Sequence, residues 1–242
     1  MELRGIILAG GKGTRLGELT KVTNKHLLPV GASPMVFHPL RKLVGAGVTE
    51  VLLVSGTEHM GDFVELLGSG RAHGCNLTYR VQDEAGGIAQ ALGLAEHFCT
   101  GGRCIVILGD NIFLDPLAPL LAEANKAADC AWLALKQVPD PKRYGVAELR
   151  GDRIVSIEEK PKRPKSDCAV AGIYLYPPDV FDLIRTLRPS ARGELEITDV
   201  NRHYLGQRRL GFRQLGGYWV DAGTLESLQL ANQLVESHGP LY

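Results

Sequence analysis

A short apolar run near the N-terminus leads directly into a loop that holds three glycines. The run is IILA (residues 6–9) and the loop is GGKGTR (residues 10–15). Because glycine lacks a Cβ, such a loop turns sharply and lets a ligand approach the backbone closely. Its exposed N–H groups form an anion site, to which Lys12 and Arg15 add positive charge. The sequence therefore predicts a buried strand that ends in a polyphosphate-binding loop.

Two standard nucleotide-binding patterns do not fit this loop. A Rossmann dinucleotide site requires a third glycine, where this chain has Leu16, and an acidic residue after the next strand, where it has Ser55. A P-loop requires Ser or Thr after its lysine, but Lys12 is followed by Gly13. With both patterns excluded, we interpret the segment as a phosphate-binding loop of another type.

Apolar runs and helical patterns alternate through the first half of the chain. Strands are expected at residues 6–9, 51–54, 76–81 and 104–108, and helices at residues 34–46, 59–67, 87–98 and 116–127. This alternation predicts an α/β fold with a doubly wound, mainly parallel sheet, whose ligands bind beyond the carboxyl ends of the strands. The residues expected at those ends are Gly10, Gln82, Gly109 and Asp110.

The second half has a different pattern. A hairpin is expected over residues 144–149 and 153–158, followed by strands at 169–176, 210–215 and 218–220 and helices at 178–187, 197–204 and 224–237. We therefore expect one domain over residues 1–242, with a mixed sheet. Its nucleotide-binding half covers about residues 1–135, and the half for a second substrate covers about residues 136–242.

Composition narrows the class of protein. The chain has 242 residues, is 45% hydrophobic and has a formal net charge of zero, which disfavours a nucleic-acid binder. No apolar segment is long enough to span a membrane, and the N-terminus does not have the pattern of a signal peptide. The five cysteines show no C-x-x-C spacing, so free thiols in a reducing cytoplasm are expected.

Several polar residues follow predicted strands, each with two possible roles. Asp110 and Asp221 are candidate Mg²⁺ ligands, or caps of a turn or helix. Lys25 is a phosphate contact or a surface lysine. Glu159 and Lys160 belong to a solvated charge run, or bind sugar hydroxyls and a phosphate, since Pro161 restricts the chain there. The histidines show no metal-ligand spacing and are interpreted as structural.

An ordered set of motifs covers nearly the whole chain and resembles the sugar-phosphate nucleotidyltransferase family. The motifs are GIILAGGKGTRL (5–16), KHLLP (25–29), VQ (81–82), GGIAQA (86–91), LGDNI (108–112), RYGV (143–146), EEKP (158–161), AVAGIY (169–174), SARGELEITD (190–199) and WVDAGT (219–224). Each motif is weakly specific alone, whereas their order is highly specific.

The resemblance implies roles for individual residues. Nucleotide binding is implied for Leu8, Gly10, Gly11, Gly13, Thr14, Arg15, Gln82, Gly87 and Asp110, and sugar-phosphate binding for Asn111, Gly145, Glu159, Lys160, Val170 and Trp219. Catalytic roles are implied for Arg15, Lys25, Asp110 and Lys160, and Mg²⁺ ligation for Asp110 and Asp221.

The resemblance also implies a reaction. The protein would transfer a nucleotidyl group from dTTP to glucose 1-phosphate, giving dTDP-glucose and pyrophosphate. We also expect a homo-oligomer, without membrane or nucleic-acid partners. Alternatives are a preference for UTP or another nucleotide or sugar, or a catalytically silent regulator that binds sugar nucleotides.

Overall fold

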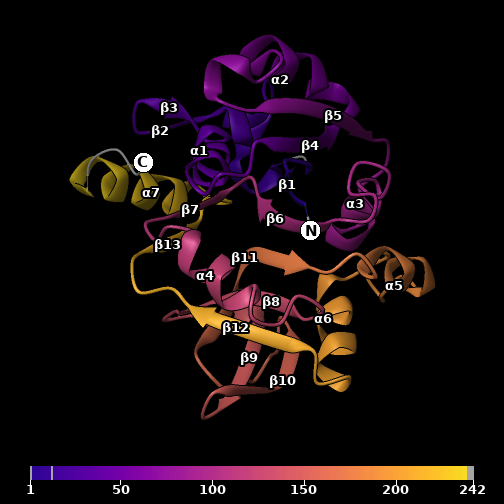
Figure 1. Cartoon of the computed structure of the whole chain (residues 1–242). Helices are drawn as coiled ribbons and strands as arrows, with labels where there is room; N and C mark the ends of the chain where they lie inside the picture. The colour runs from indigo at the N-terminus through magenta and orange to yellow at the C-terminus, as the bar shows by residue number, and fades with distance from the viewer. Residues whose placement is uncertain (1, 12, 239–242) are drawn as a thin grey trace. The chain divides into compact units, whose positions relative to one another are not determined.

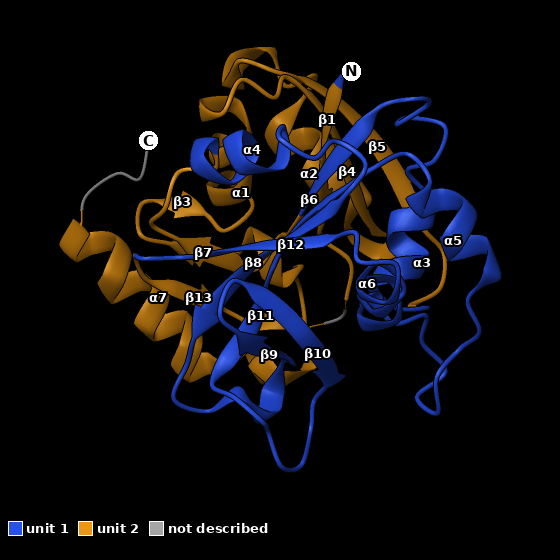
Figure 2. Ribbon diagram, turned by 60° about the horizontal axis from the view of Figure 1, so that its bottom comes forward, with its two compact units in different colours: residues 1–2, 86–106, 118–216 blue, residues 3–85, 107–117, 217–242 orange. Residues whose placement is uncertain are grey.

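The structure is a computed structural model that describes residues 2–11 and 13–238 (Figure 1). The chain forms two compact units (Figure 2). Unit 1 comprises residues 1–2, 86–106 and 118–216, and unit 2 comprises residues 3–85, 107–117 and 217–242. Each unit is assembled from separate stretches of the chain. The division into a nucleotide-binding half and a half for the second substrate concerns ligands and stays a prediction.

Unit 2 is built on a parallel sheet. Its strands are β1 (Leu3–Leu8), β4 (Glu50–Gly56) and β5 (Asn76–Gln82), with β4 paired to both of the others. The apolar runs of β1 and β4 are almost fully buried, as expected for strands covered on both faces. Helices α1 (Phe37–Gly45) and α2 (Met60–Leu67) connect these strands, and α2 packs against β5 (Figure 1).

A second, smaller set of elements in unit 2 joins distant parts of the chain. Strand β7 (Asn111–Phe113) pairs in antiparallel register with β13 (Trp219–Asp221), and β2 (Pro29–Val30) pairs with β3 (Ser33–Pro34). Helix α7 (Leu225–His238) packs against β13 and β2. Ile112 and Val220 are opposite one another and belong to one buried apolar cluster, which holds β7 and β13 together.

Unit 1 contains mostly antiparallel pairs. Its strands are β8 (Ala131–Gln137), β9 (Gly145–Arg150), β10 (Arg153–Glu159), β11 (Cys168–Tyr176) and β12 (Leu210–Gln214), and its helices are α3 (Ile88–Gly93), α4 (Ala118–Ala124), α5 (Val180–Thr186) and α6 (Ile197–Gly206). The expected hairpin is β9–β10, and β8 pairs with both β11 and β12. Strand β6 (Arg103–Leu108) runs from unit 1 into unit 2.

Three expectations about local structure were wrong or incomplete. The helix expected over residues 87–98 ends at Gly93, and the helix expected over residues 116–127 covers only α4. Strand β8 was not expected. Its alanines and leucines suit a helix as well as a strand, and its pairing with β11 and β12 decides the outcome.

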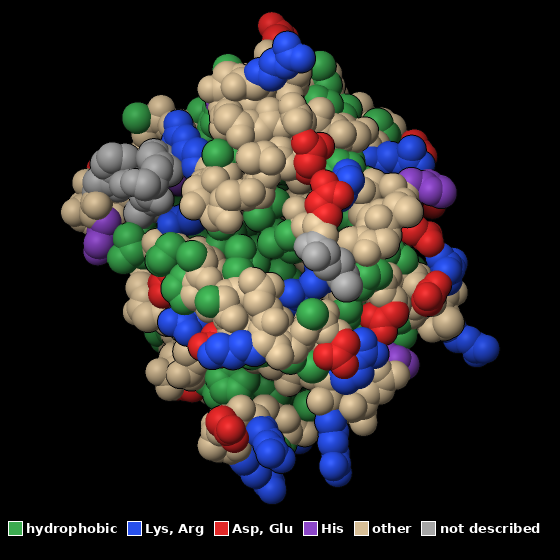
Figure 3. Space-filling model, viewed as in Figure 1, with side chains coloured by type: hydrophobic (Ala, Val, Ile, Leu, Met, Phe, Trp, Pro, Cys, Tyr) green, Lys and Arg blue, Asp and Glu red, His purple; other side chains and the backbone are tan. Residues whose placement is uncertain are grey.

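The surface and the thiols match the composition. On the face shown in Figure 3, basic and acidic side chains are intermixed. All five cysteines are free, as expected, and four of them are buried. Within residues 2–11 and 13–238, none of the helices has both the length and the apolar character that crossing a membrane requires.

Candidate functional site

The glycine loop leaves the carboxyl end of β1 in a conformation that requires glycine. Gly11 and Gly13 have φ values of +103° and +62°, which other residues rarely adopt. A Cβ on Gly13 would lie 2.9 Å from Thr20 Cγ2 and 3.1 Å from Lys25 Cβ. The loop therefore packs against the segment that carries Lys25. Lys12 lies outside the described residues.

The other predicted nucleotide-binding residues of unit 2 surround this loop. A Cβ on Gly10 would lie 2.6 Å from Gln82 Oε1, so the Gln82 side chain covers the start of the loop. The carbonyl oxygen of Leu8 accepts a hydrogen bond from the Gly109 N–H at 2.9 Å. Thr14 and Arg15 continue the loop into a 3₁₀ turn (Thr14–Thr20) and are exposed. The ends of β1, β5 and β6 thus meet at one place, as ligand sites in parallel sheets do.

Asp110 lies between β6 and β7 with both carboxylate oxygens engaged. Its Oδ1 accepts a hydrogen bond from Asn111 Nδ2 at 2.9 Å, and its Oδ2 accepts one from Lys25 Nζ. Burial raises the pKa of Asp110, but the electrostatic effects of Lys25 and His26 and the hydrogen bonds from Lys25 and Asn111 together outweigh it and keep this pKa well below the ordinary value. Asp110 precedes a strand, so it does not cap a helix. The side chain of Lys25 is 11% exposed, so Lys25 is not a surface lysine.

Asp221 is brought close to Asp110 by strand pairing. It ends β13 directly opposite Asn111, and the N–H of Ala222 donates to the carbonyl oxygen of Asp110 at 2.9 Å. The cap of α7 is supplied by Thr224 and Ser227, which exchange side-chain to backbone hydrogen bonds.

Arg15 reaches the same place. A Cβ on Gly223 would lie 2.9 Å from Asp221 Oδ1 and 3.1 Å from Arg15 Nη2, so both side chains flank this glycine.

The two carboxylates fit a hard divalent cation. Mg²⁺ is commonly held by one or two carboxylates together with phosphate oxygens and water. Over residues 2–11 and 13–238, no cluster of three or more His, Cys, Asp or Glu side chains is arranged to hold a metal ion. A site made by Asp110, Asp221 and a bound phosphate is consistent with that finding.

Three of the predicted sugar-binding residues lie together in unit 1. A Cβ on Gly145 would lie 3.5 Å from Glu159 Oε2 and 3.7 Å from Val170 Cγ2. The hydroxyl of Thr198, which was not predicted, donates to Glu159 Oε2 at 2.6 Å. Gly145 therefore lies directly beside a carboxylate that is held by a hydrogen bond.

Lys160 adopts an unusual backbone conformation next to this carboxylate. Its φ is +42°, a region that costs free energy for a residue with a side chain. Its N–H donates to the carbonyl oxygen of Tyr144 at 3.0 Å, and its Nζ lies 3.6 Å from Glu159 Oε1. The strained turn before Pro161 directs Glu159 and Lys160 toward one another, as the sequence suggested.

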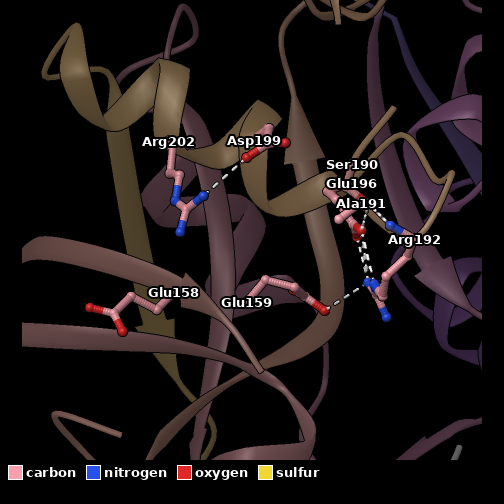
Figure 4. A pocket seen from close by; sticks show the side chains of 8 residues that line it. All are labelled: Glu158, Glu159, Ser190, Ala191, Arg192, Glu196, Asp199 and Arg202. Atoms are coloured by element: carbon pink, nitrogen blue, oxygen red, sulfur yellow. Dashed lines mark hydrogen bonds and ion pairs between the residues drawn. The ribbon is translucent and has the colours of Figure 1, made fainter. Parts of the chain in front are cut away.

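Arg192 and Glu196 also belong to this group but were not predicted. A pocket of about 560 Å³ is lined by Glu158, Glu159, Ser190, Ala191, Arg192, Glu196, Asp199 and Arg202 (Figure 4). Arg192 Nη2 donates to Glu196 Oε1 at 2.8 Å and to Glu196 Oε2 at 2.7 Å, and it also lies 3.4 Å from Glu159 Oε1. The SARGELEITD motif contained both residues, but nothing in the sequence indicated that they approach Glu159.

Three predicted residues are grouped differently from the implied roles. Gly87, implied in nucleotide binding, lies in unit 1, where a Cβ would be 2.6 Å from the carbonyl oxygen of Leu195. Asn111 and Trp219, implied in sugar-phosphate binding, lie in unit 2. There the indole Nε1 of Trp219 donates to Asn111 Oδ1 at 2.6 Å.

His26 is a buried residue that packs against the turn leading to Asp110. Its Nδ1 and its backbone N–H both donate to Asn24 Oδ1, at 2.7 and 3.0 Å. A Cβ on Gly109 would lie 2.7 Å from His26 Cδ2, so the ring packs directly against the turn before Asp110. Burial first, and then the charge of Lys25, lower the pKa of His26 from 6.5 to about 3. The ring is therefore neutral, and its role is structural.

This buried ring predicts a pH dependence of stability. In the unfolded chain His26 binds a proton below about pH 6.5, whereas in the folded protein it does so only near pH 3. The unfolded state binds more protons between these values, so the free energy of unfolding falls as the pH falls through this window. His26→Gln is expected to reduce that slope by about 1.4 kcal/mol per pH unit. Urea unfolding between pH 6 and 4 measures it.

A matched histidine controls this experiment. His97 is exposed, so His97→Gln is expected to leave the slope unchanged. An unchanged slope in His26→Gln would contradict a buried neutral ring at that position.

The chain matches known proteins over almost its full length. The family model described as "Nucleotidyl transferase" matches residues 4–238. A glucose-1-phosphate thymidylyltransferase of Neisseria meningitidis is 43% identical over 239 residues, which is 97% of this chain and 83% of that protein.

Solved structures agree with this match. A Bacillus anthracis protein, assigned as a glucose-1-phosphate thymidylyltransferase and solved with sucrose, is 53% identical, with a TM-score of 0.94 over 99% of this chain and 98% of that chain. A UDP-glucose pyrophosphorylase solved with UDP-glucose is 24% identical, with a TM-score of 0.87 over 99% of this chain and 100% of that chain, and shares the fold. The α/β class with a mixed, mainly parallel sheet is thus confirmed. This chain belongs to the nucleotidyl transferase family.

Proposed function

We propose that this protein transfers a nucleotidyl group from dTTP to glucose 1-phosphate, releasing pyrophosphate and forming dTDP-glucose. One observation carries the proposal: strand pairing brings Asp110 and Asp221 to one place, where Lys25 and Arg15 lie beside the glycine loop. Carboxylates for a cation, two basic side chains and a glycine loop are the features that a nucleoside triphosphate requires. The names and identities of the relatives supply the two substrates.

The nucleotide is assigned to the residues of unit 2. The loop of Gly10, Gly11 and Gly13, with Thr14 and Arg15, holds the triphosphate, while Gln82 contacts the base. Asp110 and Asp221 hold Mg²⁺, which neutralises phosphate charge when it is bound. Leu8 supports the loop from β1.

The sugar phosphate is assigned mainly to unit 1. Glu159 accepts hydrogen bonds from sugar hydroxyls, and Gly145 and Val170 leave room for the ring. Lys160 binds the phosphate, and Arg192 adds a second positive charge beside Glu159. Asn111 and Trp219, implied in the same role, are considered separately below.

The reaction needs no nucleophile from the protein. An oxygen of the sugar 1-phosphate attacks the α-phosphorus of dTTP in line, forming one P–O bond while the bond to pyrophosphate breaks. Two anions must approach one another, so the basic side chains of Arg15, Lys25 and Lys160 lower the barrier by offsetting their charge. Positioning by the glycine loop and Glu159 supplies the orientation.

Pyrophosphate release tests the proposal directly. The protein is assayed with Mg²⁺, glucose 1-phosphate and, in turn, dTTP, UTP, CTP, ATP and GTP. Fastest release with dTTP supports the proposal. Fastest release with UTP would mean that the protein catalyses the same type of reaction but prefers UTP as the nucleotide. No release with any nucleotide, with mannose 1-phosphate also tried as acceptor, supports the silent regulator instead.

Gly145 provides a test of the sugar assignment. A Cβ there would lie 3.3 Å from Thr198 Oγ1, closer than an ordinary van der Waals contact, and would displace the hydroxyl that donates to Glu159 Oε2. Gly145→Ala is expected to raise the KM for glucose 1-phosphate about tenfold, the equivalent of about 1.4 kcal/mol, because overpacking costs energies of this order. The KM for dTTP is expected to stay within about twofold.

A second glycine of unit 1 serves as the control. Gly206 ends α6, and a Cβ there would meet nothing within 4 Å, so Gly206→Ala is expected to leave both KM values unchanged. A rise in the KM for dTTP alone in Gly145→Ala would contradict the assignment of this pocket to the sugar.

The cellular setting is part of the proposal. A cytoplasmic location is supported by the five free cysteines. The zero net charge supports the absence of a nucleic-acid partner. A homo-oligomer remains a proposal that light scattering can test.

A further inference from the structure

Three side chains of unit 2 form a continuous line of hydrogen bonds that ends on Asp110. The indole N–H of Trp219 donates to Asn111 Oδ1 at 2.6 Å, and Asn111 Nδ2 donates to Asp110 Oδ1 at 2.9 Å. Asn111 is 1% exposed, and Trp219 and Asp110 are each 8% exposed. All three side chains are therefore shielded from water. Hydrogen bonds in such an interior are electrostatically stronger than in water.

The chemistry of the three groups determines the orientation of the Asn111 amide. An indole N–H can only donate, so the amide oxygen of Asn111 must face Trp219. The amide nitrogen then faces Asp110, whose ionised carboxylate can only accept. The opposite amide orientation would place two oxygens against one another and a donor against a donor.

The backbone prevents this line from shifting. Strands β7 and β13 pair in antiparallel register, with Asn111 opposite Asp221 and Trp219 opposite Phe113. Their apolar side chains are buried in one cluster. The indole and the amide are therefore held at a set spacing by β13, which ends in Asp221, and by β7, which follows Asp110.

We infer that Trp219 and Asn111 are positioning residues, which orient the Asp110 carboxylate for the metal ion. Asn111 holds Oδ1 and Lys25 holds Oδ2, and each carboxylate oxygen keeps a further lone pair for a cation or water. Outer hydrogen bonds of this kind commonly set the direction of a metal ligand. The inference rests on the proposed metal role of Asp110.

This role differs from the sugar-phosphate contact that the family resemblance implies for the same two residues. The Asn111 amide uses its oxygen for Trp219 and its nitrogen for Asp110, and its side chain is buried. A direct contact with the sugar phosphate would have to use the remaining N–H or lone pair of this buried amide. The two roles predict effects on different kinetic constants.

Trp219→Phe separates them, with Trp132→Phe as the matched control. Phenylalanine keeps an aromatic ring but removes the N–H that orients Asn111. Trp132, the second of two tryptophans in the chain, has an indole nitrogen with no hydrogen-bond partner among the described residues. Its replacement removes an equivalent group without touching the line.

Three quantities are measured for each variant. They are the dissociation constant of Mn²⁺ alone, from the electron paramagnetic resonance signal of free Mn²⁺, the Mg²⁺ concentration for half-maximal turnover, and the KM for glucose 1-phosphate. Trp219→Phe is expected to weaken both metal constants about tenfold or more and to change that KM less than twofold. Trp132→Phe is expected to change none of them.

The alternative outcomes contradict the inference in distinguishable ways. A raised KM for glucose 1-phosphate with unchanged metal constants would show that Trp219 contacts the sugar phosphate. Three unchanged values would show that the hydrogen bond has no effect on the site. If wild-type protein releases no pyrophosphate, the proposed function fails, but the Mn²⁺ measurement still tests the line.

A measurement on folded wild-type protein removes any dependence on the stability of Trp219→Phe. With two tryptophans, the ¹H–¹⁵N spectrum holds two indole signals, which Trp132→Phe assigns. Mg²⁺ is expected to shift the Trp219 signal in wild-type protein but not in Asp110→Asn. A Trp219 signal that does not respond while Mg²⁺ supports turnover would overturn the inference.

Discussion

Replacing Asp110 by asparagine is expected to lower kcat by about a thousandfold or more. The carboxylate is buried, ionised and held through both oxygens, and we propose that it ligates Mg²⁺. A metal ion contributes several kcal/mol of transition-state stabilisation, and about 4 kcal/mol corresponds to a factor of a thousand. The amide keeps the shape of the side chain but cannot supply the negative charge. Pyrophosphate release at saturating substrates measures the loss.

The same substitution also affects folding, so it needs two comparisons. Asp110→Asn leaves Lys25 without its carboxylate partner, at a cost of about 3 kcal/mol. Activity is therefore compared only after circular dichroism shows a folded protein. Asp62→Asn removes a partly exposed acid that pairs with His59 and is expected to retain full activity. Full activity in a folded Asp110→Asn variant would exclude this residue from the metal site.

Replacing Asp221 by asparagine is also expected to lower kcat, because we propose that Asp221 is the second carboxylate ligand of Mg²⁺. It ends β13 opposite Asn111, beside Arg15 and Gly223. Asp221→Asn tests whether two carboxylates or one hold the ion.

The parts of the fold that could be predicted are those whose pattern is local. Strands β1 and β4 are apolar runs long enough for a buried strand and too short for a helix, and the structure has both. Helix α3 shows the limit, because it stops at Gly93 where a longer apolar pattern continues. A Cβ on that glycine would lie 3.2 Å from Ile184 of α5, a contact between distant residues that no local pattern contains.

The same limit applies to the candidate site. The glycine loop and Asp110 follow strand ends, so their position could be inferred from the order of elements. Arg192 and Thr198 could not, since both act on Glu159 across more than thirty residues of sequence. The hydrogen bond of Thr198 depends on how α6 packs against β10, which is decided by tertiary contacts.

Lys25 is the residue for which activity and stability are most closely linked. Its ammonium group donates to Asp110, and both side chains are only 11% exposed. Lys25→Met would leave a buried carboxylate without its countercharge, which costs about 3 kcal/mol of the free energy of unfolding. It would also remove a positive charge from the proposed triphosphate site, and such a loss lowers kcat by a factor of about 10² to 10³.

The pH dependence distinguishes this explanation from a simple loss of packing. The folded pKa of Asp110 lies below its unfolded value of 3.8, so its contribution to stability is present above pH 3.8 and is lost as the pH falls below it. The stability difference between wild-type protein and Lys25→Met is therefore expected to shrink in acid, measured by urea unfolding in EDTA so that no metal ion replaces the lysine. Lys21→Met is the matched control, because Lys21 pairs with Glu18 on the exposed surface, where an ion pair contributes at most about 1 kcal/mol. A difference that stays constant from pH 7 to pH 3 would mean that Lys25 stabilises the fold through its aliphatic stem, and the charge pairing with Asp110 would have to be abandoned.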